Sequence, residues 1–212
     1  MAVKFGGICL LLGGIFASAA WAGPIYNIDI NTSGLTGTDG AIYFQFNPGL
    51  NSDLASITID PFSIDPPGAL TGTPLTNGGV TGSLTSLPLV IDNSGGLNDY
   101  LHFLTFGSTI SFHVAFNLPA TLTGDAGSAF GFALTATDGI TSLLTLDPSG
   151  NLGQISYELD GTFTATPLAD AAQITSAVPE PSFTGPVFLV LLTQVVILLR
   201  KRRERTVSHE TL

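Results

Sequence analysis

Short runs in which apolar and polar residues alternate occupy most of the chain between residues 26 and 166. In residues 26–31 the side chains of Ile28 and Ile30 point to one face of a predicted strand, and the polar side chains between them point to the other. A period of two is typical of strands with one buried face. The same pattern predicts further strands over residues 41–46, 54–59, 87–91, 100–106, 109–116, 128–137, 141–146, 154–159 and 162–166.

Clusters of Gly, Pro, Asn and Asp separate these predicted strands, and such residues favour turns. Asp138-Gly139 suits a two-residue type I′ turn between residues 133–137 and 140–144. Only residues 168–174 have a pattern that favours a helix, and no repeat of fixed period is present. We therefore predict an all-β fold with a single β-sandwich that is jelly-roll-like. The other turn clusters are residues 47–49, 65–68, 77–79 and 147–150.

Gly107-Ser108 predicts a two-residue type II′ loop that joins two strands in a hairpin. In that register Phe103 pairs with Phe112 on the inner face, and His102 pairs with His113 on the outer face. Two adjacent imidazoles are candidate ligands for a soft or borderline metal, or a pH-responsive contact. The alternative is a pair of half-exposed sheet residues, because two ligands alone bind a metal weakly.

Both ends of the chain carry the features of targeting segments. Residues 1–22 predict a signal peptide, because Lys4 precedes an apolar core and Ala20-Trp21-Ala22 provides small residues for cleavage. An uncleaved anchor is the alternative.

Residues 183–199 are an uncharged run of 17 residues, about 25 Å long as a helix, and predict one transmembrane helix near the lower length limit. A basic cluster follows and predicts that residues 200–212 are cytoplasmic. The cluster contains Arg200, Lys201, Arg202 and Arg203.

A short proline-rich motif precedes the apolar run, in a predicted linker over residues 171–182. It consists of Val178, Pro179, Glu180, Pro181 and Ser182. The order of this motif, an apolar span and a basic cluster resembles the C-terminal sorting signal of PEP-CTERM proteins, which are bacterial export substrates. The resemblance implies export through the Sec machinery and recognition by an exosortase-like membrane protease. The alternative is an ordinary single-pass anchor with a stiff Pro-Glu-Pro linker.

The same family resemblance extends into the predicted ectodomain, residues 23–170. Residues 44–49 and 146–150 are similar to segments of a recurring type of PEP-CTERM ectodomain, which carries no catalytic motif. The resemblance also implies an association with extracellular polysaccharide.

The charges of residues 23–182 limit the partners of this ectodomain. These residues contain twelve aspartates, Glu158 and Glu180, and no Lys or Arg, so their net charge is −14 with neutral histidines. Without cations to neutralise phosphates, nucleic-acid binding is excluded and contact with anionic lipid headgroups is disfavoured. Cys9 lies in the predicted signal peptide, so the ectodomain has no disulfide and no cysteine-based site.

Motifs for catalysis and for metal binding are missing from the sequence. There is no G-x-S-x-G elbow, no H-E-x-x-H pair and no phosphate-binding loop, so we predict that the protein is not an enzyme. Turns such as Asp92-Asn93-Ser94, Asn98-Asp99 and the pair Asp60 and Asp65 are rich in the oxygen ligands that Ca²⁺ prefers. None matches a calcium-loop motif. We predict no cofactor, with a structural Ca²⁺ at an unassigned position as the alternative.

These patterns predict a non-enzymatic protein of the bacterial cell envelope. Its domain would face outward from the membrane, and processing of the tail would place it at the cell surface or in the extracellular matrix. Two alternatives stay open: a surface module that binds glycan or calcium, and an unprocessed single-pass membrane protein.

Overall fold

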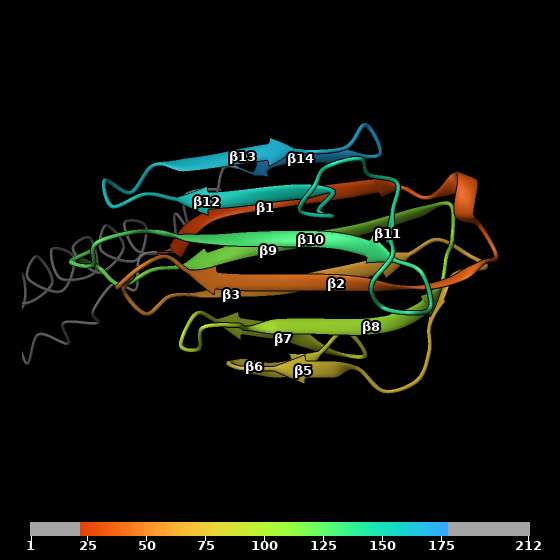
Figure 1. Ribbon diagram of the computed structural model, residues 1–212, viewed down its shortest axis with the longest axis horizontal. Coiled ribbons are helices and arrows are strands. Elements are labelled where there is room, and N and C mark those ends of the chain that lie inside the picture. The colour runs from red at the N-terminus through yellow and green to blue at the C-terminus, as the bar shows by residue number, and fades with distance from the viewer. Residues whose placement is uncertain (1–21, 178–212) are drawn as a thin grey trace, which may run out of the picture. The chain divides into compact units, whose positions relative to one another are not determined.

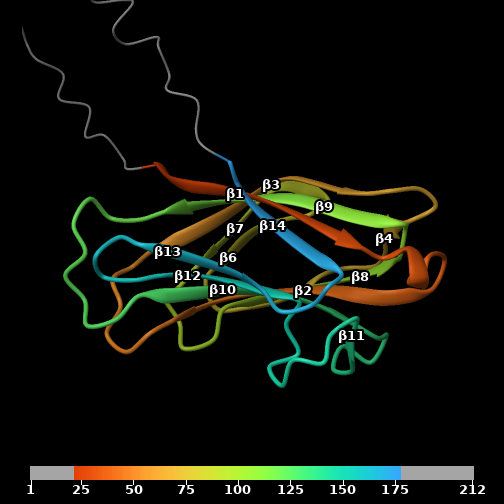
Figure 2. The same cartoon turned by 90° about the horizontal axis from the view of Figure 1, so that it is seen from above.

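Residues 22–177 are the part of the chain that the structure, a computed structural model, describes, and their strands form two antiparallel sheets that face each other (Figure 1, Figure 2). The first sheet has the order β14 (Ala172–Ala177), β1 (Ala22–Asn31), β9 (Thr109–Asn117), β3 (Ser56–Ile64), β7 (Ser86–Asp92) and β6 (Val80–Ser83). The second has the order β13 (Phe163–Pro167), β12 (Gly153–Tyr157), β10 (Ser128–Thr135), β2 (Asp39–Pro48), β8 (Asp99–Thr105) and β4 (Ala69–Leu70). The all-β prediction is confirmed, and two facing sheets are the arrangement of a β-sandwich.

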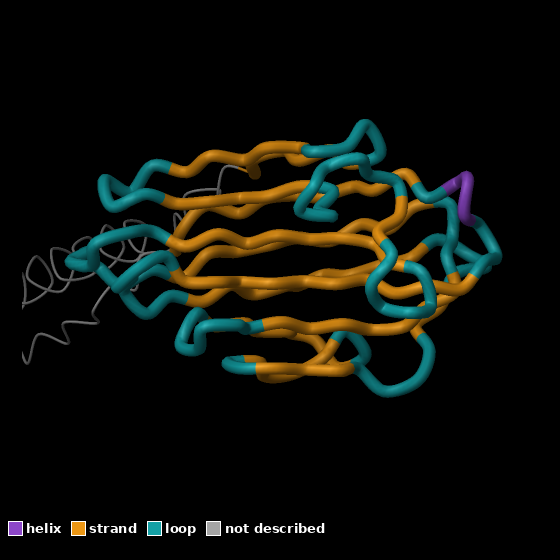
Figure 3. The backbone as a smooth tube through the Cα atoms, viewed as in Figure 1, coloured by secondary structure: helices purple, strands orange, loops and turns teal. Residues whose placement is uncertain are grey.

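Three short elements complete the described chain. Strand β11 (Ser142–Leu143) pairs with β10, and β5 (Leu75–Asn77) pairs with β8. The only helical element within residues 22–177 is one 3₁₀ turn, η1 (Ser33–Leu35), beyond the end of β1 (Figure 3). No helix in this part of the chain is long and apolar enough to cross a membrane.

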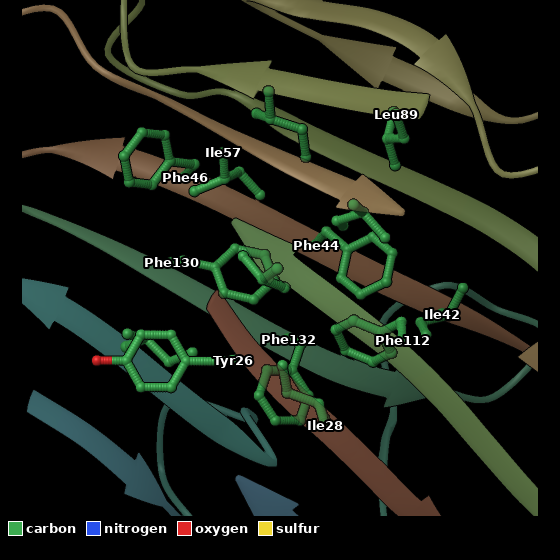
Figure 4. Close-up of a cluster of buried hydrophobic side chains, with 14 of the residues drawn as sticks. Tyr26, Ile28, Ile42, Phe44, Phe46, Ile57, Leu89, Phe112, Phe130 and Phe132 are labelled. Carbon is green, nitrogen blue, oxygen red and sulfur yellow. The ribbon is translucent and has the colours of Figure 1, made fainter. Parts of the chain in front are cut away.

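The core lies between the two sheets because alternate side chains of each long strand point inward. In β9 the inward residues are Ile110, Phe112, Val114 and Phe116, and each is buried. Aromatic rings from both sheets meet in the middle of the sandwich (Figure 4). Other buried side chains in this cluster are Tyr26, Ile28, Ile42, Phe44, Phe46, Ile57, Phe130 and Phe132.

The chain passes from one sheet to the other at many of its connections, so consecutive strands often lie in different sheets. The first and last strands are nevertheless neighbours. Strand β1 pairs with β14 in a register that places Ile25 beside Ala177 and Ile28 beside Ile174. The beginning and the end of the sandwich therefore lie at the same end of the first sheet.

Two local predictions at the C-terminal side need correction. Residues 168–174 do not form a helix, since Ala172–Ala177 form β14. The predicted ectodomain boundary at residue 170 therefore falls before the last strand, and the first part of the predicted linker, residues 171–177, belongs to the sandwich. The physical reason is tertiary: backbone pairing with β1 outweighs the weak helical preference of this segment.

The hairpin that was predicted around Asp138-Gly139 is confirmed, but its turn type is wrong. Leu134 of β10 pairs with Leu143 of β11, and the loop between the strands contains six residues. Gly139 has a positive φ of 71°, whereas Asp138 is not among the residues with positive φ. A type I′ turn requires positive φ at both positions.

Candidate functional site

Most of the residues that the sequence nominated for sorting lie outside the described residues. The motif Val178–Ser182, the apolar run 183–199 and the basic cluster from Arg200 to Arg203 all follow Ala177. The predicted signal peptide precedes the sandwich, apart from Ala22, the first residue of β1. These predictions therefore stay predictions.

The predicted pairing of His102 with His113 is wrong. Strands β8 and β9 do not form a hairpin: β8 pairs with β2 in the second sheet, and β9 pairs with β1 and β3 in the first. Gly107-Ser108 is thus a crossing between the sheets. His113 is partly exposed and lies on the outer face of the first sheet, since its neighbours Phe112 and Val114 point into the core.

His102 is buried in the core, on the opposite face of β8 from the one predicted. The Leu84 N–H donates to the Tyr100 hydroxyl at 3.0 Å, and the Tyr100 oxygen lies 2.7 Å from His102 Nδ1. With the tyrosine proton donated to Nδ1, the imidazole is neutral and carries its proton on Nε2. Nε2 is buried without a hydrogen-bond partner among the described residues. Burial is the larger effect and lowers the pKa of His102 from its usual 6.5, because a charged imidazolium is poorly solvated there, and the nearby Gly72 backbone offsets only part of this shift.

This depressed pKa predicts a pH-dependent stability. Below pH 6.5 the unfolded chain binds a proton at His102 that the folded chain resists, so stability is present above pH 6.5 and is lost as the pH falls below it. We expect the thermal midpoint to decrease between about pH 7 and pH 5.5, and the variant His102→Gln to lose most of this slope. The check is a series of circular-dichroism melts. His113→Gln is the control and should keep the slope; equal slopes in wild type and His102→Gln would refute the assignment.

The aspartates Asp53, Asp138, Asp147 and Asp160 are occupied by hydrogen bonds, which are local in all of them except Asp53. In Asp138, Asp147 and Asp160 the largest cause of a lowered pKa is the hydroxyl of a Ser or Thr two or three residues later. In Asp53 it is the N–H of Gly124. Within residues 22–177 no three His, Cys, Asp or Glu side chains converge in a way that would hold a metal ion. The oxygen-rich turns thus act as turn formers in the described structure.

The calcium candidates around residues 92–99 have structural partners. The Asn93 side chain accepts a hydrogen bond from the Ala55 N–H at 2.7 Å and donates to the Asp53 carbonyl and the Ser128 hydroxyl, each at 2.8 Å. Asp99 accepts a hydrogen bond from the Tyr43 hydroxyl at 3.0 Å. These bonds join neighbouring strands and loops, so the residues hold the fold together.

A polar cavity on the outer face of the second sheet is the site that sequence reasoning missed. The connection that contains β11 folds back over this face, outside the sandwich (Figure 2). Between the connection and the sheet lies a cavity of about 270 Å³. Its lining residues come from β2, β10 and the connection itself: Tyr43, Gln45, Ala133, Thr135, Gly139, Ile140, Ser142, Ser149, Gly150 and Asn151.

The geometry of the cavity wall is fixed by a chain of hydrogen bonds. Asn47 donates to the Gln45 side chain at 3.1 Å, and Gln45 Nε2 donates to Asn151 Oδ1 at 3.3 Å. Burial, and secondly the Asp99 carboxylate, raise the pKa of Tyr43 well above 10, so its hydroxyl stays protonated and remains a donor. The wall therefore presents neutral amides and hydroxyls in defined positions.

Comparisons with known proteins add no relative to this picture. No family model, no curated protein and no solved structure matches the chain.

Proposed function

We propose that this chain is an exported, non-enzymatic protein of the cell surface or extracellular matrix. In this proposal a signal peptide directs it to the Sec machinery, and the sandwich, of jelly-roll-like type, forms the outward-facing domain. A transmembrane helix over residues 183–199 and the basic cluster hold the chain in the membrane. An exosortase-like protease then recognises the motif Val178–Ser182. The support is the order of these segments in the sequence.

The position of the sandwich within the chain is the structural observation that supports the proposal best. Its first strand begins at Ala22, and its last strand ends at Ala177, directly before Val178. Apart from Ala22, the folded body thus occupies the interval between the predicted cleavage position and the predicted sorting motif. Because Ile25 lies beside Ala177, both predicted targeting segments are attached to the same end of the sandwich.

The chemistry of the described residues suits an extracellular location. Residues 22–177 contain no Cys, Lys or Arg, so the body needs no disulfide exchange on export and repels other copies of itself through its acidic side chains. Stability then rests on the buried aromatic core and on the hydrogen bonds of the sheets.

The C-terminus of the protein from its native host tests the proposal. We expect the mature chain to end near Pro181 or Ser182, or to carry an added group there, in an intact-mass measurement of membrane and medium fractions. Because no Lys or Arg lies between Lys4 and Arg200, trypsin does not cut this interval, and a protease that cleaves at aspartate is suitable for peptide mapping. As a matched control, replacement of Pro179, Glu180 and Pro181 by alanine should leave the chain full length. A wild-type chain that still ends at Leu212 in the membrane would contradict sorting.

A second candidate function, a surface module that binds glycan, is favoured by the polar cavity over β2 and β10. The cavity is lined by uncharged side chains that donate and accept hydrogen bonds.

A further inference from the structure

The cavity beneath the β11 connection exists because β10 carries small outward residues. Phe130, Phe132 and Leu134 point into the core, so Gly131, Ala133 and Thr135 occupy the outer face. An added Cβ on Gly131 would lie 3.0 Å from both Gln45 Nε2 and Asn151 Nδ2. The space over Gly131 is filled by the Gln45 and Asn151 amides, whereas Ala133 and Thr135 leave room above the sheet that these longer polar side chains border.

The connection that covers the cavity is held in place at both ends. The Ala136 N–H donates to the Thr141 carbonyl at 2.8 Å, and the Leu152 N–H donates to the Phe132 carbonyl at 2.8 Å. Between these points, the Asp138 carboxylate accepts hydrogen bonds from the N–H groups of Ile140 and Thr141 at 2.9 and 2.8 Å. The cavity is therefore largely preformed, as small-molecule sites usually are.

One buried polar group in the cavity has no partner. Thr135 lines the cavity and is 5% exposed, and its Oγ1 has no hydrogen-bond partner in the described part of the chain. Native proteins rarely leave buried hydroxyls unpaired, because such a group loses its bonds to water and gains none in return. An unpaired hydroxyl beside a polar cavity favours a bound molecule that supplies the partner, and because Oγ1 has almost no accessible surface in this structure, the Thr135 side chain must rotate to meet it.

The chemistry of the wall selects the class of that molecule. Tyr43 is the one ionisable side chain in the lining and it stays neutral, but the carboxylates of Asp99, Asp138 and Asp147 are bonded to Tyr43, Ile140 and Ser149 of the wall. A phosphate would therefore be repelled, and the lining offers no carboxylate ligand for a metal ion. Amides and hydroxyls that both donate and accept match a ligand rich in hydroxyl groups. The Tyr43 ring and Ala133 add an apolar surface for C–H groups. We propose that this cavity binds one neutral sugar residue. The inference rests on the second candidate function, for which it names the class of ligand, and it does not depend on the sorting proposal.

Titration of the purified full-length chain with neutral sugars tests the inference. The probes are glucose, galactose, mannose and N-acetylglucosamine, with glucuronate and glucosamine as charged comparators and dextran as a neutral polymer. We expect at least one neutral sugar to give saturation-transfer NMR signals at about 10 mM or less, and the anionic glucuronate to bind more weakly because the protein is acidic. Stronger binding of glucosamine than of every neutral sugar would instead make the ligand cationic and overturn the proposal. Binding of dextran as well as glucose would indicate a polysaccharide ligand, and binding of monosaccharides alone would indicate a free sugar.

The variant Thr135→Val separates a ligand site from a structural role. Valine has nearly the same shape, and Thr135 Oγ1 makes no described hydrogen bond, so folding should be retained while sugar affinity falls about three- to tenfold. Thr164→Val, at an exposed position of β13 in the same sheet, is the matched control and should bind like wild type.

A second pair of variants tests the space in the cavity. Ala133→Leu should fill it and abolish binding, whereas Ala129→Leu, on the same face of β10 but outside the cavity, should not. The proposal is overturned by the absence of signals from every neutral sugar, by unchanged affinity in Thr135→Val and Ala133→Leu, or by a crystal structure grown with the sugar that shows only ordered water at Thr135.

Discussion

Replacing Phe112 with alanine is expected to destabilise the sandwich by about 4 kcal/mol, because a large ring is removed from the centre of a close-packed core. Phe112 is 1% exposed and contacts rings from both sheets (Figure 4). Its ring centroid lies 5.1 Å from that of Phe44, 5.6 Å from that of Phe132 and 6.3 Å from that of Phe62. Since most domains are stable by only about 5–15 kcal/mol, this loss is a large part of the total.

Urea unfolding followed by far-ultraviolet circular dichroism measures the effect, because residues 22–177 contain no tryptophan for fluorescence. Phe103→Ala is the matched control. Phe103 is only partly buried, on the outer face of β8, so its removal should cost about 1 kcal/mol or less. A larger loss for Phe103→Ala than for Phe112→Ala would mean that β8 has the opposite face inward.

The strands with strict alternation were predictable from the sequence. In β1 from Tyr26 onward and in β9 the large apolar residues recur at every second position, and those residues form the core. In β2 the core residues Ile42, Phe44 and Phe46 also alternate, with Ala41 and Tyr43 as additional apolar residues on the other face. Local alternation is sufficient there because each strand buries one face against the opposite sheet. Strands β4, β5 and β6 were not predicted, since they are short, lie at sheet edges and expose most of their side chains.

The face of β8 was not predictable from local pattern. The sequence favoured an inward Phe103, whereas Tyr100, His102 and Leu104 point inward. Leu101 lies on the outer face but is only 8% exposed, because the connection that contains Gly139 covers it. An added Cβ on Gly139 would lie 3.4 Å from Leu101 Cδ1. Because the connection covers the outer face of β8, that face also carries an apolar side chain, and the local pattern does not show which face points into the core.

The crossing at Gly107-Ser108 also depends on distant residues. Thr32 donates its hydroxyl to the Gly107 carbonyl at 2.8 Å and its N–H to the Ser108 carbonyl at 2.9 Å. Thr32 lies 75 residues before Gly107, so these hydrogen bonds cannot be predicted from the residues around the turn. The polar cavity was missed for the same reason. Its neutral residues belong to no motif and meet only because the β11 connection folds over β2 and β10.

Replacing Asn98 with alanine is expected to destabilise the protein by about 3 kcal/mol, because four hydrogen bonds are lost from a buried position. Asn98 is fully buried. Its Oδ1 accepts from the N–H groups of Gly79 and Gly95 at 2.9 and 3.0 Å. Its Nδ2 donates to the carbonyls of Gly95 and Phe46 at 2.8 and 3.2 Å. Alanine leaves all four backbone groups without these partners.

The measurement is a urea unfolding curve, in which the midpoint should fall while the slope stays constant. Asn117→Ala is the matched control, because Asn117 is exposed and makes one side-chain bond, to Thr58 at 3.0 Å, so its loss should cost no more than about 0.5 kcal/mol. Equal midpoints for the two variants would contradict a structural role for Asn98.

Added Ca²⁺ tests the alternative that the turn around Asn98 binds calcium. A wild-type midpoint that rises with Ca²⁺, and an Asn98→Ala midpoint that does not, would make this turn a calcium site. We expect both midpoints to be unchanged, because the Asn98 side chain already makes four hydrogen bonds within the protein.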